Sequence, residues 1–279
     1  MGQNGLTSPK SQLHQNGVRR LIDVAAPLFK RDISARYRGS VVGLAWTFLV
    51  PLLMLAIYAF VFGSVFQMRW SPETGDQNGG LLDFALILFV GLMTHSYATE
   101  VLTRSPHIIL SHVNLVKRVV FPLQILPIMT VSTALFQYFV SLLVFLCFQF
   151  VATGAVSPGV LWLPVIVAPF TLLLVGCGWF LAAFTVYFRD VAQLMGLAAT
   201  VLLFMSPVFY PVSRLPAGLW PLFQLNPLTF IIEQSRLAVF SGMAPDFVGL
   251  ALYTAVAALV AIVGFLTFER LRKGFSDVL

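Results

Sequence analysis

The sequence predicts an all-α membrane protein with six transmembrane helices. Hydrophobic residues make up 58% of the chain and charged residues only 10%, whereas a soluble domain carries about a quarter of charged residues. The mean hydropathy is +0.89, and long uncharged stretches follow one another along the chain. A bilayer core of roughly 30 Å needs about 20 apolar residues per spanning helix, so each such stretch predicts one span.

The uncharged stretches that are long enough to cross lie at about residues 41–66, 84–103, 119–151, 160–188, 191–212 and 247–268. The third and fourth exceed a straight crossing, so tilt or kinks at Pro122 and Pro127 must absorb the excess. Residues 28–279 then form one membrane domain, and residues 1–27 form a polar cytoplasmic N-terminus. No short apolar segment with a cleavage site follows that N-terminus, so we expect no removable signal peptide.

Basic residues predict the orientation of the spans. With the N-terminus inside, 14 of the 17 lysines and arginines fall in cytoplasmic segments, and Arg69, Arg214 and Arg236 fall outside. This is the positive-inside bias. A seventh crossing at Leu215–Ile232 would put the basic residues after residue 268 on the wrong side, so we predict an outer re-entrant or interfacial helical hairpin there. Both termini are then cytoplasmic, and the net charge of +6 reflects topology rather than nucleic-acid binding.

A short amphipathic interfacial helix is predicted just before the first span. From Leu28 onward apolar residues recur at helical spacing, cationic residues face away from them, and Pro27 suits a first helical turn. Such a helix lies along the cytoplasmic surface, either as an anchor whose cations reach toward anionic headgroups or as a mechanical contact. Its candidate interface residues are Phe29, Lys30, Arg31, Arg36, Tyr37 and Arg38.

The cytoplasmic segment from Arg104 to Arg118 is too apolar for an ordinary solvated loop. An exposed apolar patch implies a protein partner, and the alternative is that these residues rest on the bilayer surface. His107 and His112 are five residues apart and do not share one helical face, which argues against a metal site. The candidate contact residues are Arg104, His107, Ile108, Ile109, Leu110, His112, Leu115, Lys117 and Arg118.

Few charges lie within or beside the spans. Glu100 is predicted to pair with a nearby basic residue such as Arg104, because an unpaired charge near the bilayer is costly. Arg189 and Asp190 occupy a tight inner turn, where we predict a local salt bridge that fixes two helices. No lysine follows a glycine, so the chain has no Walker-type phosphate loop. It also offers no plausible catalytic acid and base, so we expect no enzymatic activity and no ATP hydrolysis by this chain alone.

Aromatic residues reach 14% of the chain, and several lie near the outer ends of spans. One interpretation is an interfacial aromatic belt. The other is that some of them line a pathway and offer flat apolar faces to sugar rings. The candidates for a channel or outer gate are Phe62, Phe66, Phe209, Tyr210, Trp220 and Phe223.

Five segments in series resemble the membrane subunits of type-2 ABC exporters, in the branch that exports O-antigen and related polysaccharides. Their order and spacing cover the chain from about Leu28 to its end, outside the polar first twenty residues. The matching segments are Arg36–Ser40 with Leu44, Trp46 and Pro51, Lys117–Pro122 with Leu126 and Pro127, Tyr187–Val191, Ser206–Pro211, and Leu225–Leu228 ahead of Arg236.

This resemblance implies a homodimer bound to two copies of a separate ATPase, which binds ATP and Mg²⁺ while this chain holds no cofactor. It implies a channel along the dimer interface for an undecaprenyl-linked polysaccharide in the cytoplasmic membrane of a bacterium. The Arg104–Arg118 segment would be a coupling helix, the amphipathic helix would also contact the ATPase, and the hairpin would form the outer gate. ATP binding would move the coupling helices and thereby open or ratchet the channel.

Several alternatives stay open on the sequence. Capsular polysaccharide or teichoic acid could be exported by the same architecture, and a small hydrophobic drug is a more distant cargo. A non-transporting scaffold or a glycan-modifying enzyme is the alternative of a different class. Arg189, or Arg36 with Arg38, is a further hypothetical contact for the lipid pyrophosphate. The sequence does not distinguish the identity or length of the glycan.

Overall fold

Every regular element in the described part of the chain is a helix, as the sequence predicts. The computed structural model describes Pro27, Phe29, Asp32, Ser40, Pro216, Gly218 and residues 42–61, 81–116, 121–212 and 220–279.

Four helices are long and apolar enough to cross a membrane, and two further apolar helices are shorter. The long ones are α3 (Leu81–Ile108), α5 (Ile125–Thr153), α6 (Leu163–Tyr187) and α10 (Phe247–Leu271), and the shorter ones are α2 (Trp46–Tyr58) and α7 (Val191–Met205). The remaining α-helices are α4 (Val113–Val116), α8 (Trp220–Gln224), α9 (Pro227–Ser241) and α11 (Phe275–Val278). Short 3₁₀ turns are η1 (Gly43–Ala45), η3 (Leu110–His112), η4 (Pro158–Trp162) and η7 (Arg272–Gly274).

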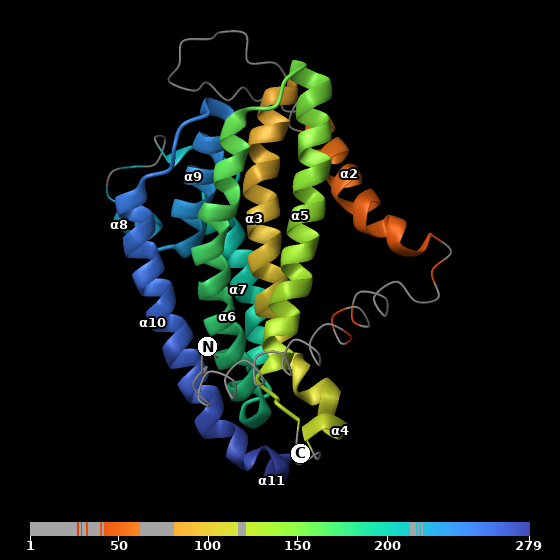
Figure 1. Ribbon diagram of the computed structural model, residues 1–279, viewed down its shortest axis with the longest axis vertical. Coiled ribbons are helices and arrows are strands. Elements are labelled where there is room, and N and C mark those ends of the chain that lie inside the picture. The colour runs from red at the N-terminus through yellow and green to blue at the C-terminus, as the bar shows by residue number, and fades with distance from the viewer. Residues whose placement is uncertain are drawn as a thin grey trace, which may run out of the picture.

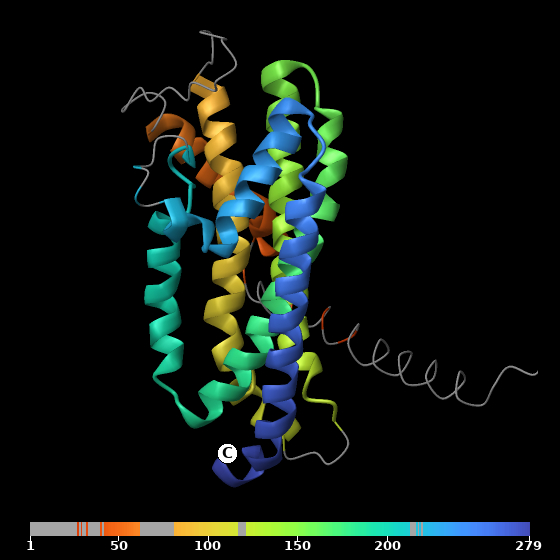
Figure 2. The same cartoon turned by 90° about the vertical axis from the view of Figure 1, so that its left-hand side faces the viewer.

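Helix α3 is the centre of the bundle, and it packs against α2, α5, α6, α7 and α9. Helices α5, α6 and α10 run along the same long axis, while α2 leans away obliquely on the outside (Figure 1). Helix α9 packs at one end of the bundle, which we call the α9 end, and α4 and α11 lie at the opposite end, which we call the α11 end. Figure 2 shows that α7 is much shorter than its neighbours and stops below the α9 end.

Local signals fix several helix ends. Asp246 begins α10, because its Oδ1 accepts hydrogen bonds from the amides of Val248 and Gly249 at 3.0 and 3.1 Å. Gly154 and Gly242 end α5 and α9 with φ angles of 70° and 65°, in the left-handed region that favours glycine.

Two apolar clusters hold the bundle together. The larger one surrounds α3 and includes Tyr97, Phe145 and Phe170. The second lies at the α11 end, where residues from the end of α3 and the start of α5 meet Phe268 and Phe275. The Tyr187 hydroxyl donates to the Leu271 carbonyl at 2.8 Å, which ties the end of α6 to the end of α10.

Three helices have different ends from the spans predicted for them. The second predicted span ends at residue 103, whereas α3 continues to Ile108. The third begins at residue 119, whereas residues 121–124 are non-helical and α5 begins at Ile125. Pro122 precedes α5 and Pro127 lies in its first turn, so neither kinks it. The fifth ends at Met205 rather than residue 212, because Pro207 disfavours a helical Ser206, which is extended at φ −102° and ψ 151°.

Other predicted elements match in part. Helix α2 lies within the predicted first span, of which residues 62–66 are outside the described residues. The predicted hairpin covers α8 and the first part of α9, which continues to Ser241, well past the predicted end at Ile232.

Candidate functional site

A charge network lies toward the α11 end of α3. Arg104 Nη1 lies 3.0 Å from Glu100 Oε1, which is the pairing expected from the sequence. Arg104 Nη2 lies 3.1 Å from Asp32 Oδ2, and the Thr133 hydroxyl of α5 donates to the same oxygen at 3.0 Å. One guanidinium therefore pairs with two carboxylates, and the planar fork of arginine suits this arrangement.

Asp32 is a contact residue that the sequence interpretation missed. It belongs to the predicted amphipathic helix, and Phe29 of the same segment makes an edge-to-face contact with Phe136 of α5, with ring centroids 6.4 Å apart. The sequence signal that could have identified Asp32 as a contact residue is that it is acidic within a strongly basic segment. The other candidate residues of this helix, Lys30, Arg31, Arg36, Tyr37 and Arg38, lie outside the described residues, so their role stays a prediction.

A polar strip runs along the second half of α3. Its residues recur every three or four positions, so they lie on one helical face. Apart from Leu102, every residue between Ser96 and His107 that reaches the surface is polar. A polar face is costly in contact with hydrocarbon, so this face is suited to water or to a polar molecule. The polar strip consists of Ser96, Thr99, Glu100, Thr103 and His107.

Helix α7 lies beside α3 along this strip (Figure 2). The contact includes His95 Nε2, which lies 3.0 Å from the carbonyl oxygen of Ala199 and 3.2 Å from the hydroxyl of Thr99. Gln193 and Thr200, two turns apart on α7, are both exposed. The two helices therefore present polar groups to the same side of the bundle.

The segment after α3 is not the exposed apolar patch that the sequence predicts. Ile108 is 7% exposed and Ile109 is fully buried, and both belong to the cluster formed with Phe268 and Phe275. Their apolar character is explained by packing inside the protein. These two side chains are therefore not part of the exposed surface.

The surface of the same segment is mixed. The fully exposed side chains are polar, namely His107, Ser111 and Asn114. The partly exposed ones are mostly apolar, namely Leu110, His112, Val113, Leu115 and Val116. Lys117 and Arg118 lie outside the described residues. The face that a partner could reach thus has polar side chains at its most exposed positions.

Part of the predicted outer aromatic set lies together. Tyr210 and Phe223 make an edge-to-face contact with centroids 6.0 Å apart, and Phe209 contacts Phe204 at 6.2 Å. Phe223 is buried and Trp220 is exposed. Phe62 and Phe66 lie outside the described residues, and a pathway role of the aromatic set stays a prediction.

The predicted salt bridge at the turn between α6 and α7 is not seen. Arg189 and Asp190 are both exposed, and neither forms an ion pair within the described ranges. The turn is instead held by its backbone, since the Asp190 carbonyl accepts from the amides of Gln193 and Leu194 at 3.1 and 3.2 Å.

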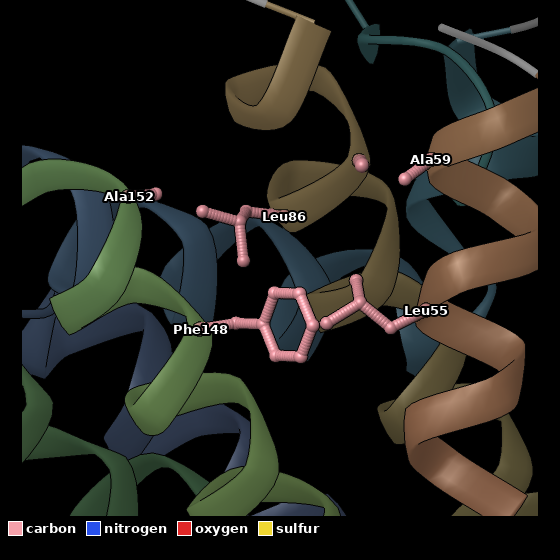
Figure 3. A pocket seen from close by; sticks show the side chains of 6 residues that line it. Leu55, Ala59, Leu86, Phe148 and Ala152 are labelled. Carbon is pink, nitrogen blue, oxygen red and sulfur yellow. The ribbon is translucent and has the colours of Figure 1, made fainter.

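A small pocket opens between α2, α3 and α5 (Figure 3). Phe148 of α5 reaches toward Leu55 of α2, and Leu86 of α3 lies beside them. Its empty volume is about 220 Å³ and its lining is entirely apolar. It offers no partner for a hydroxyl group, so it does not suit a sugar, in contrast to the polar strip on α3.

The fold and these sites can be compared with known proteins. Residues 26–240 match the family described as "ABC-2 type transporter". The chain belongs to this family. The match covers the elements from the segment of Asp32 to α9, so the charge network, the polar strip and the aromatic residues all lie within it.

Individual relatives are similar over almost their whole length. The chain is 29% identical over 255 residues to the O-antigen export system permease protein RfbA of Myxococcus xanthus, covering 90% of this chain and 93% of that protein. It is 23% identical over 260 residues to the RfbA protein of Klebsiella pneumoniae, covering 93% and 96%. It is 24% identical over 250 residues to the polysialic acid transport protein KpsM of Escherichia coli, covering 87% and 92%.

Proposed function

We propose that this chain is the membrane subunit of an ATP-driven exporter that moves a lipid-linked polysaccharide of the O-antigen type across the bacterial cytoplasmic membrane. The similarity to O-antigen export permeases over nine-tenths of the chain supports the cargo class. The observation that carries the proposal is the polar strip on α3, because a polar face within an apolar bundle provides a path for a hydroxyl-rich polymer.

The proposed topology has six crossings by α2, α3, α5, α6, α7 and α10, with both termini in the cytoplasm. The α11 end then lies inside, and the α8–α9 hairpin re-enters from the outer side. Arg104, Arg189, Arg270, Arg272 and Lys273 all belong to segments at the α11 end. Their position agrees with the positive-inside rule, which supports this orientation.

The path is proposed to lie at a homodimer interface. Ser96 and Thr99 on α3, with Gln193 and Thr200 on α7, would face the polymer from each copy. Weak hydrogen bonds that any sugar hydroxyl can make would let the polymer slide, because no single contact fixes it. The aromatic set near Tyr210 would meet the polymer at the outer end, where it leaves the bundle.

Two copies of a separate ATPase are the proposed partners, and they would bind ATP and Mg²⁺. The exposed side chains of His107, Ser111 and Asn114 form the surface that would receive them. The buried Ile109 lies directly beneath and packs against the starts and ends of neighbouring helices. A displacement of this surface by the ATPase would therefore move the packed helices, because Ile109 couples the segment to them.

Deleting the gene tests the proposal. We expect surface polysaccharide to disappear and the undecaprenyl-linked polymer to accumulate inside the cell, as seen on a gel of lipid-linked glycans from surface and whole-cell fractions. A plasmid copy of the wild-type gene should restore the surface polymer. An unchanged surface would contradict polysaccharide export. The similarity to KpsM favours capsular polysaccharide as the second candidate cargo, and the same gel shows which polymer is retained.

A further inference from the structure

Helix α7 is shorter than the hydrocarbon core is thick, so the segment after it must complete this crossing. Its 15 residues extend about 22 Å at 1.5 Å per residue, whereas the hydrocarbon core is roughly 30 Å thick. The last carbonyl groups of a helix have no partner within that helix. The end of α7 therefore exposes hydrogen-bond acceptors at a depth where water is scarce, and other parts of the protein must supply the donors.

The hydroxyls of Ser206 and Tyr210 donate to the carbonyls of Leu202 and Phe204 at the end of α7. Arg236 of α9 binds the backbone that follows α7. Its Nη1 donates to the Pro207 carbonyl at 2.5 Å and its Nη2 to the Val208 carbonyl at 2.7 Å. Its Nε donates to the Ile87 carbonyl of α3 at 3.1 Å. A guanidinium holds its N–H groups in one rigid plane. One side chain on α9 thus binds the backbone of two other segments at once.

Asn226 completes the connection between α7 and α9. Its Nδ2 donates to the Met205 carbonyl and to the Ser206 hydroxyl, both at 2.9 Å. Its Oδ1 accepts from the Leu228 amide at 2.9 Å, which begins α9. The same residue therefore starts α9 and satisfies the end of α7, so these two helices have a fixed relative position.

Gly91 of α3 has no side chain, which leaves room for the Arg236 guanidinium beside the helix. A Cβ atom added to Gly91 would lie 2.8 Å from Arg236 Nη2 and 3.2 Å from the Val208 Cα. The first contact is shorter than a Cβ atom tolerates and the second is tight, so a side chain at this position would displace the guanidinium from the place it occupies. The bond to Ile87 thus forms at a position on α3 that is shaped to receive the guanidinium.

We propose that Arg236 is a positioning residue of the transport cycle, which holds the segment after α7 and α9 to α3 so that they move as one body. Helix α3 continues without a break to Arg104, which binds Asp32 and Glu100. A displacement at the ATPase side would therefore reach the outer hairpin directly through α3. This inference rests on the proposed function, because it assigns a role in export.

The test compares Arg236→Gln and Arg236→Lys in the full-length chain assembled with its ATPase in lipid nanodiscs. Lysine keeps the positive charge but lacks the planar fork, so it cannot reach all three carbonyls. Leu237→Ala is the matched control, because Leu237 is exposed on the same helix. Hydrogen–deuterium exchange, which needs no cargo, should become faster at residues 206–212 in the Gln variant, intermediate in the Lys variant and unchanged in the control.

Export is then measured per folded complex in proteoliposomes or cells. We expect at least a tenfold loss for Arg236→Gln while ATP hydrolysis continues. Unchanged exchange would overturn the proposal, and so would faster exchange with normal export per folded complex. If the Gln variant does not assemble, Gly91→Ala displaces the guanidinium from the α3 side and should give the same two effects. Failure of the wild-type protein to export polysaccharide would instead refute the proposed function and leave the exchange result standing.

Discussion

Gly176 of α6 and Gly264 of α10 meet where neither residue has room for a side chain. A Cβ atom added to Gly176 would lie 2.7 Å from the Cα of Ala261, and one added to Gly264 would overlap the Gly176 carbonyl. Small residues allow helix backbones to approach closely inside a membrane, where hydrophobic burial between helices contributes little. This seam is the basis of the close packing of α10 on α6.

Replacing Gly264 with alanine should therefore destabilise the protein. We expect a loss of about 1–3 kcal/mol from overpacking, seen as a lower midpoint in thermal unfolding of the detergent-solubilised chain. Gly196→Ala on α7 is the control, because a Cβ atom there meets nothing within 4 Å. Equal midpoints for the two variants would show that the seam tolerates a methyl group.

Asp32 and Arg104 should be energetically coupled. A double-mutant cycle with Asp32→Ala and Arg104→Ala should give an interaction energy of about 0.5–3 kcal/mol, because each single change leaves a carboxylate or a guanidinium without this partner. The measurement is thermal or chemical unfolding of the four proteins. Asp190→Ala should change stability by less than about 0.5 kcal/mol, since Asp190 is exposed and makes no described ion pair. Strict additivity of the two single changes would contradict the coupling.

The hydroxyl group of Ser96 should matter for export. The variants Ser96→Thr and Ser96→Val have side chains of nearly the same shape, but only threonine carries a hydroxyl group. Comparing them isolates the contribution of that hydroxyl group to the polar strip. We expect Thr to retain export and Val to lower it on the order of threefold to tenfold, the equivalent of about 1 kcal/mol. Surface polymer would be compared at equal protein levels, with Val256→Leu on the exposed face of α10 as the control. Equal export by both variants would argue against a polymer path along this strip.

Buried and exposed residues of the segment after α3 should behave differently. Ile109→Ala should cost about 2–5 kcal/mol of stability through a cavity, because the side chain is fully buried. His107→Ala and Asn114→Ala should leave stability nearly unchanged but weaken retention of the ATPase in co-purification. Retention at the wild-type level in both surface variants would mean that the ATPase binds elsewhere.

Hydropathy was sufficient to locate the six apolar helices α2, α3, α5, α6, α7 and α10, because each predicted span overlaps one of them. Some helix ends are also set by residues close in sequence. The Asp246 side chain accepts a hydrogen bond from the Val248 amide and starts α10, and the left-handed backbone of Gly154 ends α5. The early end of α7 has a local cause too, because Pro207 disfavours a helical Ser206. The environment of Arg104 is only partly local: it pairs with Glu100 one turn away, as predicted, and with Asp32, which is 72 positions away in the chain.

Burial and long-range hydrogen bonding escaped prediction for the same reason. Ile109 looked exposed because a run of apolar residues beside cations is typical of a binding surface, but Phe268 and Phe275 of the C-terminal region cover it. On the sequence, Asn226 belonged only to a matching segment, and Arg236 was noted beside that segment and as a basic residue on the outer side. Their role depends on the early end of α7, because Asn226 bonds the Met205 carbonyl at that end and Arg236 bonds two carbonyls of the segment that follows.

The bond from Arg236 to Ile87 spans 149 positions of the chain, which has a consequence for biogenesis. During synthesis α3 enters the membrane long before α9 emerges from the ribosome. An arginine near the middle of a helix opposes its insertion by about 2.5–3.5 kcal/mol on translocon scales, so α9 is a poor insertion substrate by itself. The site on α3 that binds Arg236 is therefore already in the bilayer when α9 is synthesised. A chain translated from Val191 onward should fail to retain α9 in the membrane unless the earlier helices are supplied as a separate fragment.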